Sequence, residues 1–445
     1  MSKVLLIGYN PPQLIQGVKI EAAHYRTWQF LEPLLDDGHE ILLCAGARGE
    51  KAQSVAVPEA WAAQLQVQPI AFGEAGWITP LQAAHDRFQP DCIVAVNFSH
   101  CLYATKLRTC KPIWMDIYGD MMTIMQASFY RTQSDRGLET SIGFMHEVLR
   151  TGDAFSGCGA PQKHMTVGEL AMAGRLNRRT FGYEFAHVVL PGSLPKPDAS
   201  PKRAPKRQAL AAHGIGDDEF VVLWCGGYNT WTDVGTLFRG LEAAMQREPR
   251  LRYVSVGANT YEAVDNTYTQ LQTLIERSKY KDRFVLLGWR PWSEIPAYYR
   301  ESDIGINIDA LHYETLYGTR TRLTEMIASG LPVITTYGPE LSYLLEAKQA
   351  GLTFAVGDWQ TLGNKLAQIA DDPEQRDQLA ERALDYARNE LSFAATTACV
   401  RQWVKAPKLA PDKAPKAVRD RIRNIEYRMR ATLRHTLWRV NGSDK

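Results

Sequence analysis

Short apolar runs alternate with longer amphipathic segments along the first part of the chain. Lys3 to Tyr9 (KVLLIGY) is an unbroken apolar run, which is typical of a strand buried on both faces of a parallel sheet. Between most of these runs lie segments with helical periodicity, and this alternation predicts right-handed crossovers and a doubly wound sheet. The expected strands are Lys3 to Tyr9, Glu40 to Ala45, Cys92 to Val96, Pro112 to Ile117, Ala154 to Cys158 and His187 to Leu190, and the expected helices are Glu21 to Leu35, Asp135 to Arg150 and Pro161 to Leu176.

The pattern is interrupted and then begins again. Pro191 to Lys206 reads PGSLPKPDASPKRAPK, and five prolines among basic residues favour a linker, because proline breaks helices and central strands. A second α/β cycle follows, with strands expected at Phe220 to Cys225, Arg252 to Val256, Arg283 to Leu287, Ile304 to Ile308, Pro332 to Thr336 and Leu352 to Ala355. Its helices are expected at Val234 to Arg247, Thr267 to Ser278, Trp292 to Glu301 and Gln360 to Ala370.

The sequence therefore predicts two Rossmann-like domains, 1–192 and 208–388, joined by a linker at 193–207. Ligands of such sheets bind beyond the carboxyl ends of the strands, so two facing domains create a cleft between them. Residues 389–445 are expected to form a crossover helix and a basic amphipathic tail.

The tail combines an apolar stripe with many arginines. A helix of this kind is suited to an anionic membrane surface, and packing on the first domain or on a partner protein explains the stripe equally well. The stripe consists of Val418, Ile422, Ile425, Met429 and Leu433. We therefore expect residues 413–440 to contact a membrane, a partner or the first domain.

The composition excludes several classes of protein but indicates no particular binding partner. Of the 445 residues 45% are hydrophobic and 22% are charged, and the net charge is only +2. No apolar run approaches the roughly 20 residues of a membrane span. The chain enters its first strand without a signal-peptide pattern, and its seven cysteines form no CxxC pair, so we expect a cytoplasmic protein without a zinc site. Basic and aromatic residues form no nucleic-acid stripe, and the absence of GxGxxG disfavours a dinucleotide dehydrogenase.

The stretch from Tyr313 to Thr336, YETLYGTRTRLTEMIASGLPVITT, carries the clearest candidate chemistry. Gly318 and Thr319 have the character of a helix start, where free backbone N–H groups can receive an anion. Arg320 and Arg322 follow in the expected first turn. Glu325 lies nearly two turns further on, where a carboxylate can accept hydrogen bonds from sugar hydroxyls. An amphipathic helix with surface arginines is the alternative interpretation.

Several segments in the right order resemble the GT-B-fold glycosyltransferases of the retaining, glycogen-synthase-like type. The resemblance extends to about Thr397. Its most specific part is the stretch just described, ending in GLPVITT, which is similar to the donor-binding helix and following strand of that family. The segments DGHEILL, GCGAPQKHMTVGELAMAGRLN and GGYNTWTDVGTLFRGLE resemble other parts of the family, as does the loop that contains Gly17.

The resemblance implies transfer of a sugar from a nucleotide-sugar, with retention at the anomeric carbon and without a metal or another cofactor. It places the donor in the second domain, whereas the acceptor, a sugar, glycan, lipid-linked or small molecule, lies in the first. A departing nucleotide diphosphate then needs helix N–H groups and cationic side chains, for which Gly318, Thr319 and Arg320 are candidates. Glu325 matches the family's second glutamate, which is expected to hold the donor ribose. The base and the sugar stay open.

Two departures from the family pattern concern the donor. The first family glutamate is replaced by Tyr317, and the arginine and lysine of the first donor-domain loop are replaced by Gly227 and Thr232. Tyr228 and Asn229 stand between these two positions. Phosphate neutralisation then depends on Arg320, Arg322 or Arg290. Either the donor differs from the usual ones, or the chain is a binding or scaffold protein of the same fold; an epimerase or coupling enzyme is a further alternative.

Four further positions are candidates by their place after predicted strands or in loops. Gly257 permits close approach of a ligand or makes a plain turn, and Gly17 is expected near the transferred sugar. Trp289 or Arg290 can pack on a nucleobase, with hydrophobic core as the alternative for the tryptophan.

Two carboxylates are expected to face the acceptor. Asp116 and Asp120 (MDIYGDMM) follow a predicted strand on the first domain's side of the cleft, where a carboxylate can orient an acceptor hydroxyl. The alternatives are a buried, hydrogen-bonded carboxylate for Asp116 and a helix cap for Asp120. We expect a cytoplasmic enzyme, with the inner face of the membrane as an additional site through the tail.

Overall fold

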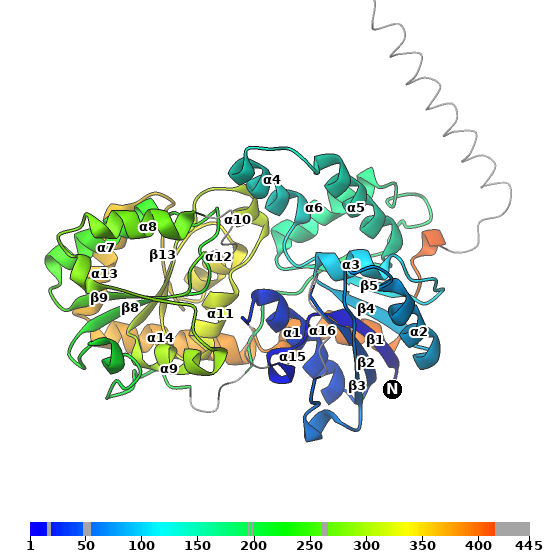
Figure 1. Ribbon diagram of the computed structural model, residues 1–445, viewed down its shortest axis with the longest axis horizontal. Helices are drawn as coiled ribbons and strands as arrows, with labels where there is room; N and C mark the ends of the chain where they lie inside the picture. Colours follow the sequence, from blue (N-terminus) through cyan, green and yellow to red (C-terminus); the bar gives the residue numbers. More distant parts are fainter. Residues whose placement is uncertain (16–18, 48–54, 195, 197–198, 260–265, 414–445) are drawn as a thin grey trace, which may run out of the picture.

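The computed structural model describes residues 1–15, 19–47, 55–194, 196, 199–259 and 266–413. Two α/β domains lie side by side (Figure 1), and every pair of neighbouring strands in both sheets is parallel. This confirms the predicted fold class. Both Gly17 and the predicted tail helix, whose stripe begins at Val418, lie outside the described residues.

The first domain contains a seven-stranded sheet in the order β3-β2-β1-β4-β5-β6-β7. Its inner strands are largely apolar and inaccessible to water, as expected when helices cover both faces of a parallel sheet, whereas the edge strands β3 and β7 are partly exposed. The strands are β1 (Lys3–Gly8), β2 (Glu40–Ala45), β3 (Leu65–Pro69), β4 (Cys92–Val96), β5 (Ile113–Asp116), β6 (Ala154–Gly157) and β7 (Ala186–Val188). The helices are α1 (Ala22–Asp36), α2 (Ile78–Phe88), α3 (Phe98–Ala104), α4 (Met121–Thr132), α5 (Leu138–Thr151) and α6 (Ala160–Met172).

The second domain contains a six-stranded sheet in the order β10-β9-β8-β11-β12-β13. Its strands are β8 (Phe220–Cys225), β9 (Leu251–Val256), β10 (Phe284–Gly288), β11 (Ile304–Asn307), β12 (Val333–Thr336) and β13 (Leu352–Phe354). Its helices are α7 (Val234–Arg247), α8 (Thr267–Glu276), α9 (Ile295–Glu301), α10 (Tyr313–Tyr317), α11 (Thr321–Ala328), α12 (Glu340–Ala347), α13 (Trp359–Ala370) and α14 (Pro373–Asn389). The strand order reverses between β8 and β11, which is where sheets of this class bind ligands.

The chain returns to the first domain near its end. The short helices α15 (Phe393–Thr396) and α16 (Ala398–Lys405) lie beside α1 in Figure 1. Val400, Trp403 and Val404 join the first domain's core, and the Ser2 hydroxyl donates a hydrogen bond to the Val404 carbonyl (2.9 Å). No helix in the described ranges is long and apolar enough to cross a membrane.

In the described ranges, six short 3-10 helices connect these elements. They are η1 (Pro12–Leu14), η2 (Glu59–Trp61), η3 (Ala211–His213), η4 (Lys281–Arg283), η5 (Trp292–Glu294) and η6 (Pro411–Lys413). Of these, η5 follows β10 and carries a tryptophan that reaches the first domain.

Candidate functional site

The carboxyl ends of strands in both sheets meet at the interface between the domains. Side chains and loops that follow β5 and β6 contact α10 and α11, which follow β11. The Tyr118 and Thr321 hydroxyls are hydrogen-bonded (2.5 Å), and the Cys158 thiol donates to the Tyr317 carbonyl (3.4 Å). The candidate site therefore lies where the topology of each sheet predicts a ligand.

A second group of contacts joins the domains through aromatic side chains. Trp292 lies edge-on to Tyr25 and Trp28 of α1, with ring centroids 6.5 and 6.4 Å apart, and its indole N–H donates to the Tyr25 hydroxyl. The Lys19 ammonium lies 4.0 Å from the ring centroid of Trp289. Trp289, a candidate for stacking on a nucleobase, thus faces a first-domain lysine in this structure.

Arg322 lies at the point where the strand order of the second sheet reverses. Its guanidinium is 4.0 Å from the Trp224 ring centroid, and Nη2 donates to the Gly227 carbonyl (2.7 Å). Its Nη1 is buried and has no hydrogen-bond partner among the residues that the structure describes. Burial lowers the pKa of this guanidinium. A half-buried cation with one buried, unused donor can bind an anion, because leaving a buried donor unpaired is costly.

Arg320, in contrast, is surrounded by carboxylates. Its Nε is 2.9 Å from an Asp309 carboxylate oxygen and Nη2 is 2.8 Å from Glu314, and the side chain is buried. Burial by itself lowers the pKa of Arg320, but the two carboxylates raise it overall. The expectation that Arg320 neutralises a phosphate does not fit this geometry, because its charge is already balanced inside the domain.

The helix of the candidate stretch begins later than the sequence indicates. The helix α11 starts at Thr321 with Arg320 as its N-cap, whereas Gly318 ends the preceding short helix α10 and donates its N–H to Glu314 O (2.6 Å). A Cβ at Gly318 would lie 2.5 Å from the Glu314 carboxylate, so this glycine makes room for that side chain. Thr319 offers its carbonyl to Arg320 (2.9 Å).

Glu325 is buried on α11 and is held by the linker. Ser193 donates to one of its carboxylate oxygens (2.9 Å) and Lys196 to the other (2.7 Å). In the predicted role of Glu325, a ribose hydroxyl would bind its carboxylate. Two linker residues already contact that carboxylate in this structure. Sequence reasoning missed Ser193 and Lys196, because nothing in a proline-rich linker indicates which side chain folds back.

Both predicted acceptor-facing carboxylates are buried within the first domain. Asp116 accepts from Arg26 Nε (2.8 Å) and Nη2 (2.7 Å) and from the Ser156 hydroxyl (2.5 Å). Asp120 caps α4 by accepting from the Thr123 N–H (2.7 Å). Asp116 is thus a buried, hydrogen-bonded carboxylate and Asp120 is a helix cap, which are the alternative interpretations of the sequence. Neither side chain is presented to an acceptor.

The candidates after β8 form a tight, mostly internal loop. The Tyr228 hydroxyl is 2.7 Å from those of Tyr253 and Ser255, deep in the core, and the Asn229 N–H donates to Thr232 (3.2 Å). Gly257 has φ +127°, and a Cβ there would lie 2.1 Å from the carbonyl oxygen of Gly226. The sequence analysis expected a ligand or a plain turn at Gly257, and in this structure the close contact is with the backbone of Gly226.

Arg290 and Tyr317 are the remaining candidates. Arg290 has a buried Nε without a hydrogen-bond partner in the described part of the chain. Tyr317, which replaces the family's first glutamate, stacks on Tyr313 with centroids 6.4 Å apart. Glu314 is not a substitute for that glutamate, because it is buried and paired with Arg320.

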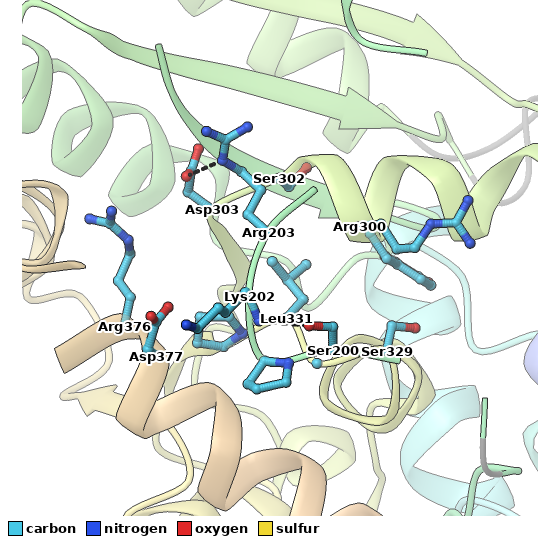
Figure 2. Close-up of a pocket in the computed structure, with 14 residues that line it drawn as sticks. Ser200, Lys202, Arg203, Arg300, Ser302, Asp303, Ser329, Leu331, Arg376 and Asp377 are labelled. Carbon is cyan, nitrogen blue, oxygen red and sulfur yellow. Dashed lines mark hydrogen bonds and ion pairs between the residues drawn. The ribbon is translucent and has the colours of Figure 1, made fainter. Parts of the chain in front are cut away.

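A separate cavity lies at the opposite, amino-terminal ends of β11 and β12. It has a volume of about 100 Å³, and linker residues including Lys202 and Arg203 line one side of it. Figure 2 shows Arg203 paired with Asp303 beside it (3.1 Å). The cavity is thus remote from the strand ends that carry the candidate site.

Comparison with known proteins agrees with this architecture. Residues 219–372 match the model of a family described as glycosyl transferases group 1. No curated protein matches the chain. Among solved structures the chain is similar to HepE of Anabaena in complex with UDP and glucose, with 17% identity, a TM-score of 0.63 and coverage of 91% of this chain and 100% of that one.

Two other solved structures have the same arrangement. Sucrose-phosphate synthase from Thermosynechococcus elongatus matches with 15% identity and a TM-score of 0.66, covering 91% of this chain and 98% of that one. WaaG, a glycosyltransferase involved in lipopolysaccharide biosynthesis, matches with 12% identity and a TM-score of 0.61, covering 91% and 100%. At such identities the likeness shows the fold, which is GT-B. Together with the family match in the second domain, it supports a GT-B glycosyltransferase.

Proposed function

We propose that the protein is a retaining, metal-independent glycosyltransferase that moves a hexose from a nucleotide-sugar to a sugar, glycan, lipid-linked or small-molecule acceptor. The family match in the second domain supports the transfer of a sugar. The similar HepE structures contain UDP, with glucose or as UDP-glucose, which supports a nucleotide-sugar as the donor here. Retention and the absence of a metal requirement rest on the family resemblance of the sequence.

The Nη1 of Arg322, which has no hydrogen-bond partner among the described residues, carries the proposal. A leaving nucleotide diphosphate develops negative charge, and preorganised donors placed at that charge lower the barrier most when the site excludes water. Arg322 lies at the switch point between β8 and β11, and its buried Nη1 is unused within the described chain. Arg290, whose Nε is also unused, follows β10 at the same end of the sheet. These two cations take the place of the family's arginine and lysine in this proposal.

The proposed roles of Glu325 and of the first domain follow from their positions in the fold. Glu325 accepts ribose hydroxyls from its place on α11, sharing its carboxylate with Lys196 or displacing it. The acceptor lies on the first domain, where the loop after β5 meets α11 through Tyr118 and Thr321. Closing the two domains around the donor excludes water that would otherwise hydrolyse it.

The first experiment is a thermal-shift screen against UDP, GDP, ADP, CMP and their common sugar conjugates, with and without EDTA. A ligand that binds only the folded state raises the melting temperature. We expect one nucleotide to raise it equally in both conditions. In Arg322→Gln the same shift should need roughly tenfold to a hundredfold more ligand, because a hydrogen bond to a charged group is worth about 1.5–3 kcal/mol.

The matched control is Arg277→Gln, since Arg277 is exposed on the same domain. An equal shift in Arg322→Gln and wild type contradicts the phosphate assignment, and a shift abolished by EDTA contradicts metal independence. The anomeric configuration of the product, measured by NMR, then tests retention.

Tyr317 favours a second candidate function, a GT-B binding or scaffold protein. A phenol stands where the family has a glutamate, and the neighbouring Glu314 is committed to Arg320. No shift with any nucleotide at millimolar concentration would favour this candidate. Interconversion of a donor without any acceptor would instead indicate an epimerase.

A further inference from the structure

The linker between the domains folds back onto the carboxylate that the proposed function assigns to the donor ribose. Ser193 donates its hydroxyl to one Glu325 carboxylate oxygen (2.9 Å), and Lys196 donates its ammonium to the other (2.7 Å). The Glu325 side chain is 8% exposed and that of Lys196 is 21% exposed. Each oxygen therefore has a donor from the linker, and the ion pair is largely withdrawn from water.

The backbone that carries the first of these donors is itself fixed in place. The N–H of Ser193 donates to the Leu391 carbonyl (2.9 Å), and Ser193 also forms a parallel bridge with Ser392. A Cβ on the preceding residue, Gly192, would lie 2.9 Å from the same Leu391 oxygen, so a larger residue there would force the chains apart. The serine hydroxyl therefore reaches Glu325 from a backbone that is held close to a second segment of the chain.

A further hydroxyl beside Glu325 comes from the first domain. Tyr25 of α1 accepts from the Trp292 indole, and burial, followed by the charge of Glu325, raises the pKa of the Tyr25 hydroxyl well above its usual range. This hydroxyl is a neutral donor. The ammonium of Lys196 in addition gains the attraction of two opposite charges, which is strengthened by their withdrawal from water. Of the groups around the carboxylate, the phenol is thus easier to displace than the lysine.

The carboxylate has capacity for a ligand while the linker stays in place. An ionised carboxylate accepts about four hydrogen bonds, two on each oxygen. With one linker donor on each oxygen, Glu325 can accept one further hydroxyl on each. The two neighbouring hydroxyls of a ribose fit such a pair of oxygens. A ribose that binds here takes the place of Tyr25 and shares the carboxylate with Ser193 and Lys196.

We propose that Ser193 and Lys196 are positioning residues of the donor site, which hold the Glu325 carboxylate so that it receives both ribose hydroxyls. The inference rests on the proposed function, because it requires a nucleotide in the second domain. It extends that function by assigning the linker to the donor site. An acceptor that is already fixed and ionised loses little freedom when the hydroxyls arrive, and this preorganisation strengthens binding.

The test compares a nucleotide with its dideoxy form, which lacks both ribose hydroxyls. Titration calorimetry of the full chain measures both affinities for whichever of UDP, GDP, ADP and CMP binds the wild type. We expect the wild type to prefer the ribose form, and Lys196→Met to reduce this preference about tenfold, as expected for loss of a hydrogen bond to a charged group. A general effect on folding would instead weaken the binding of both forms alike.

Two further variants complete the test. Ser193→Ala removes a single hydroxyl and should reduce the preference about threefold, and it keeps the test decisive if Lys196→Met does not fold. Lys206→Met alters an exposed lysine of the same linker and should keep the wild-type preference.

The possible failures are distinguishable. An unchanged preference in both Lys196→Met and Ser193→Ala, or a larger one in Lys196→Met, overturns this inference alone. Equal binding of both forms by the wild type overturns the ribose role of Glu325 together with the inference. A wild type that binds none of the four nucleotides contradicts the proposed function as a whole.

Discussion

Arg320 and Arg322 are two residues apart and have opposite electrostatic surroundings. Residues at this spacing at a helix start point in different directions. Arg320 therefore meets Asp309 and Glu314 inside the domain, whereas within the described chain Arg322 meets a carbonyl and the face of Trp224. The first has a structural role, and the second keeps capacity for a ligand.

This contrast predicts different stability effects at the two positions. Arg320→Met should lower the free energy of unfolding by about 3–5 kcal/mol, because it leaves two buried carboxylates without a counter-charge. Arg322→Met should cost clearly less, since it exposes no buried carboxylate. Urea denaturation of the two variants measures the difference. Equal losses would mean that the carboxylates around Arg320 are stabilised by other groups.

At the residue scale, the sequence predicted the kinds of side chain at the site but not their partners. Arg322 and Glu325 could be chosen from the spacing around GLPVITT. The ion pairs of Arg320 could not be predicted, because Asp309 and Glu314 come from a loop and a five-residue helix whose conformation depends on tertiary packing. Asp116 similarly depends on Arg26, ninety positions away.

At the element scale, α4 and α6 share a pair of carboxyl groups. Asp120 caps α4 and Glu169 projects from α6, and burial together with Asp120 raises the pKa of Glu169 to about 8. The pair therefore holds a proton at neutral pH that the unfolded chain has released. One of the Glu169 oxygens has no partner in the described chain.

Proton binding by this pair makes stability pH-dependent. Between the ordinary glutamate pKa of 4.5 and about 8 the folded protein binds more protons than the unfolded chain, so the free energy of unfolding falls as pH rises. Glu169→Gln should flatten that fall, because an amide does not titrate. Urea denaturation at several pH values from 5 to 9 checks this, with Glu139→Gln on the exposed side of α5 as the control. An unchanged slope in Glu169→Gln would contradict it.

Elements with strong apolar runs were predictable, and weakly patterned ones were not. β4, β8 and α7 agree with the sequence to within a residue, because their apolar positions are continuous or strictly periodic. β3 at Leu65–Pro69 (LQVQP) is a short edge strand whose alternation is too brief to detect. The helix α10 has five residues, too few for a helical period to be detected, and it contacts α4 and α6 of the first domain.

At the scale of the whole molecule, the domains meet through one polar and one aromatic group of contacts. The polar contacts join the loops after β5 and β6 and the start of α6 to α10, α11 and α12, as when the Ala160 N–H donates to Glu340 (2.5 Å). The aromatic contacts join α1 to η5. Both must separate for the domains to open.

Trp292→Ala should therefore favour an open molecule. Each aromatic pair is worth about 0.5–1.5 kcal/mol, and Trp292 takes part in two of them. We expect a larger radius of gyration by small-angle X-ray scattering and weaker nucleotide binding. Trp61→Ala, which alters a tryptophan that packs only on the first domain, should leave both unchanged. An unaltered radius in Trp292→Ala would show that the polar contacts alone hold the domains.

The chain crosses between the domains twice, and the two crossings are joined. Ser193 forms a parallel bridge with Ser392 and donates its N–H to the Leu391 carbonyl (2.9 Å). The two crossings therefore form one joint rather than two independent tethers. Sliding one domain along the other would shear this bridge, whereas a change in the angle between the domains bends both crossings together. The molecule is thus mechanically biased toward opening by rotation at this joint.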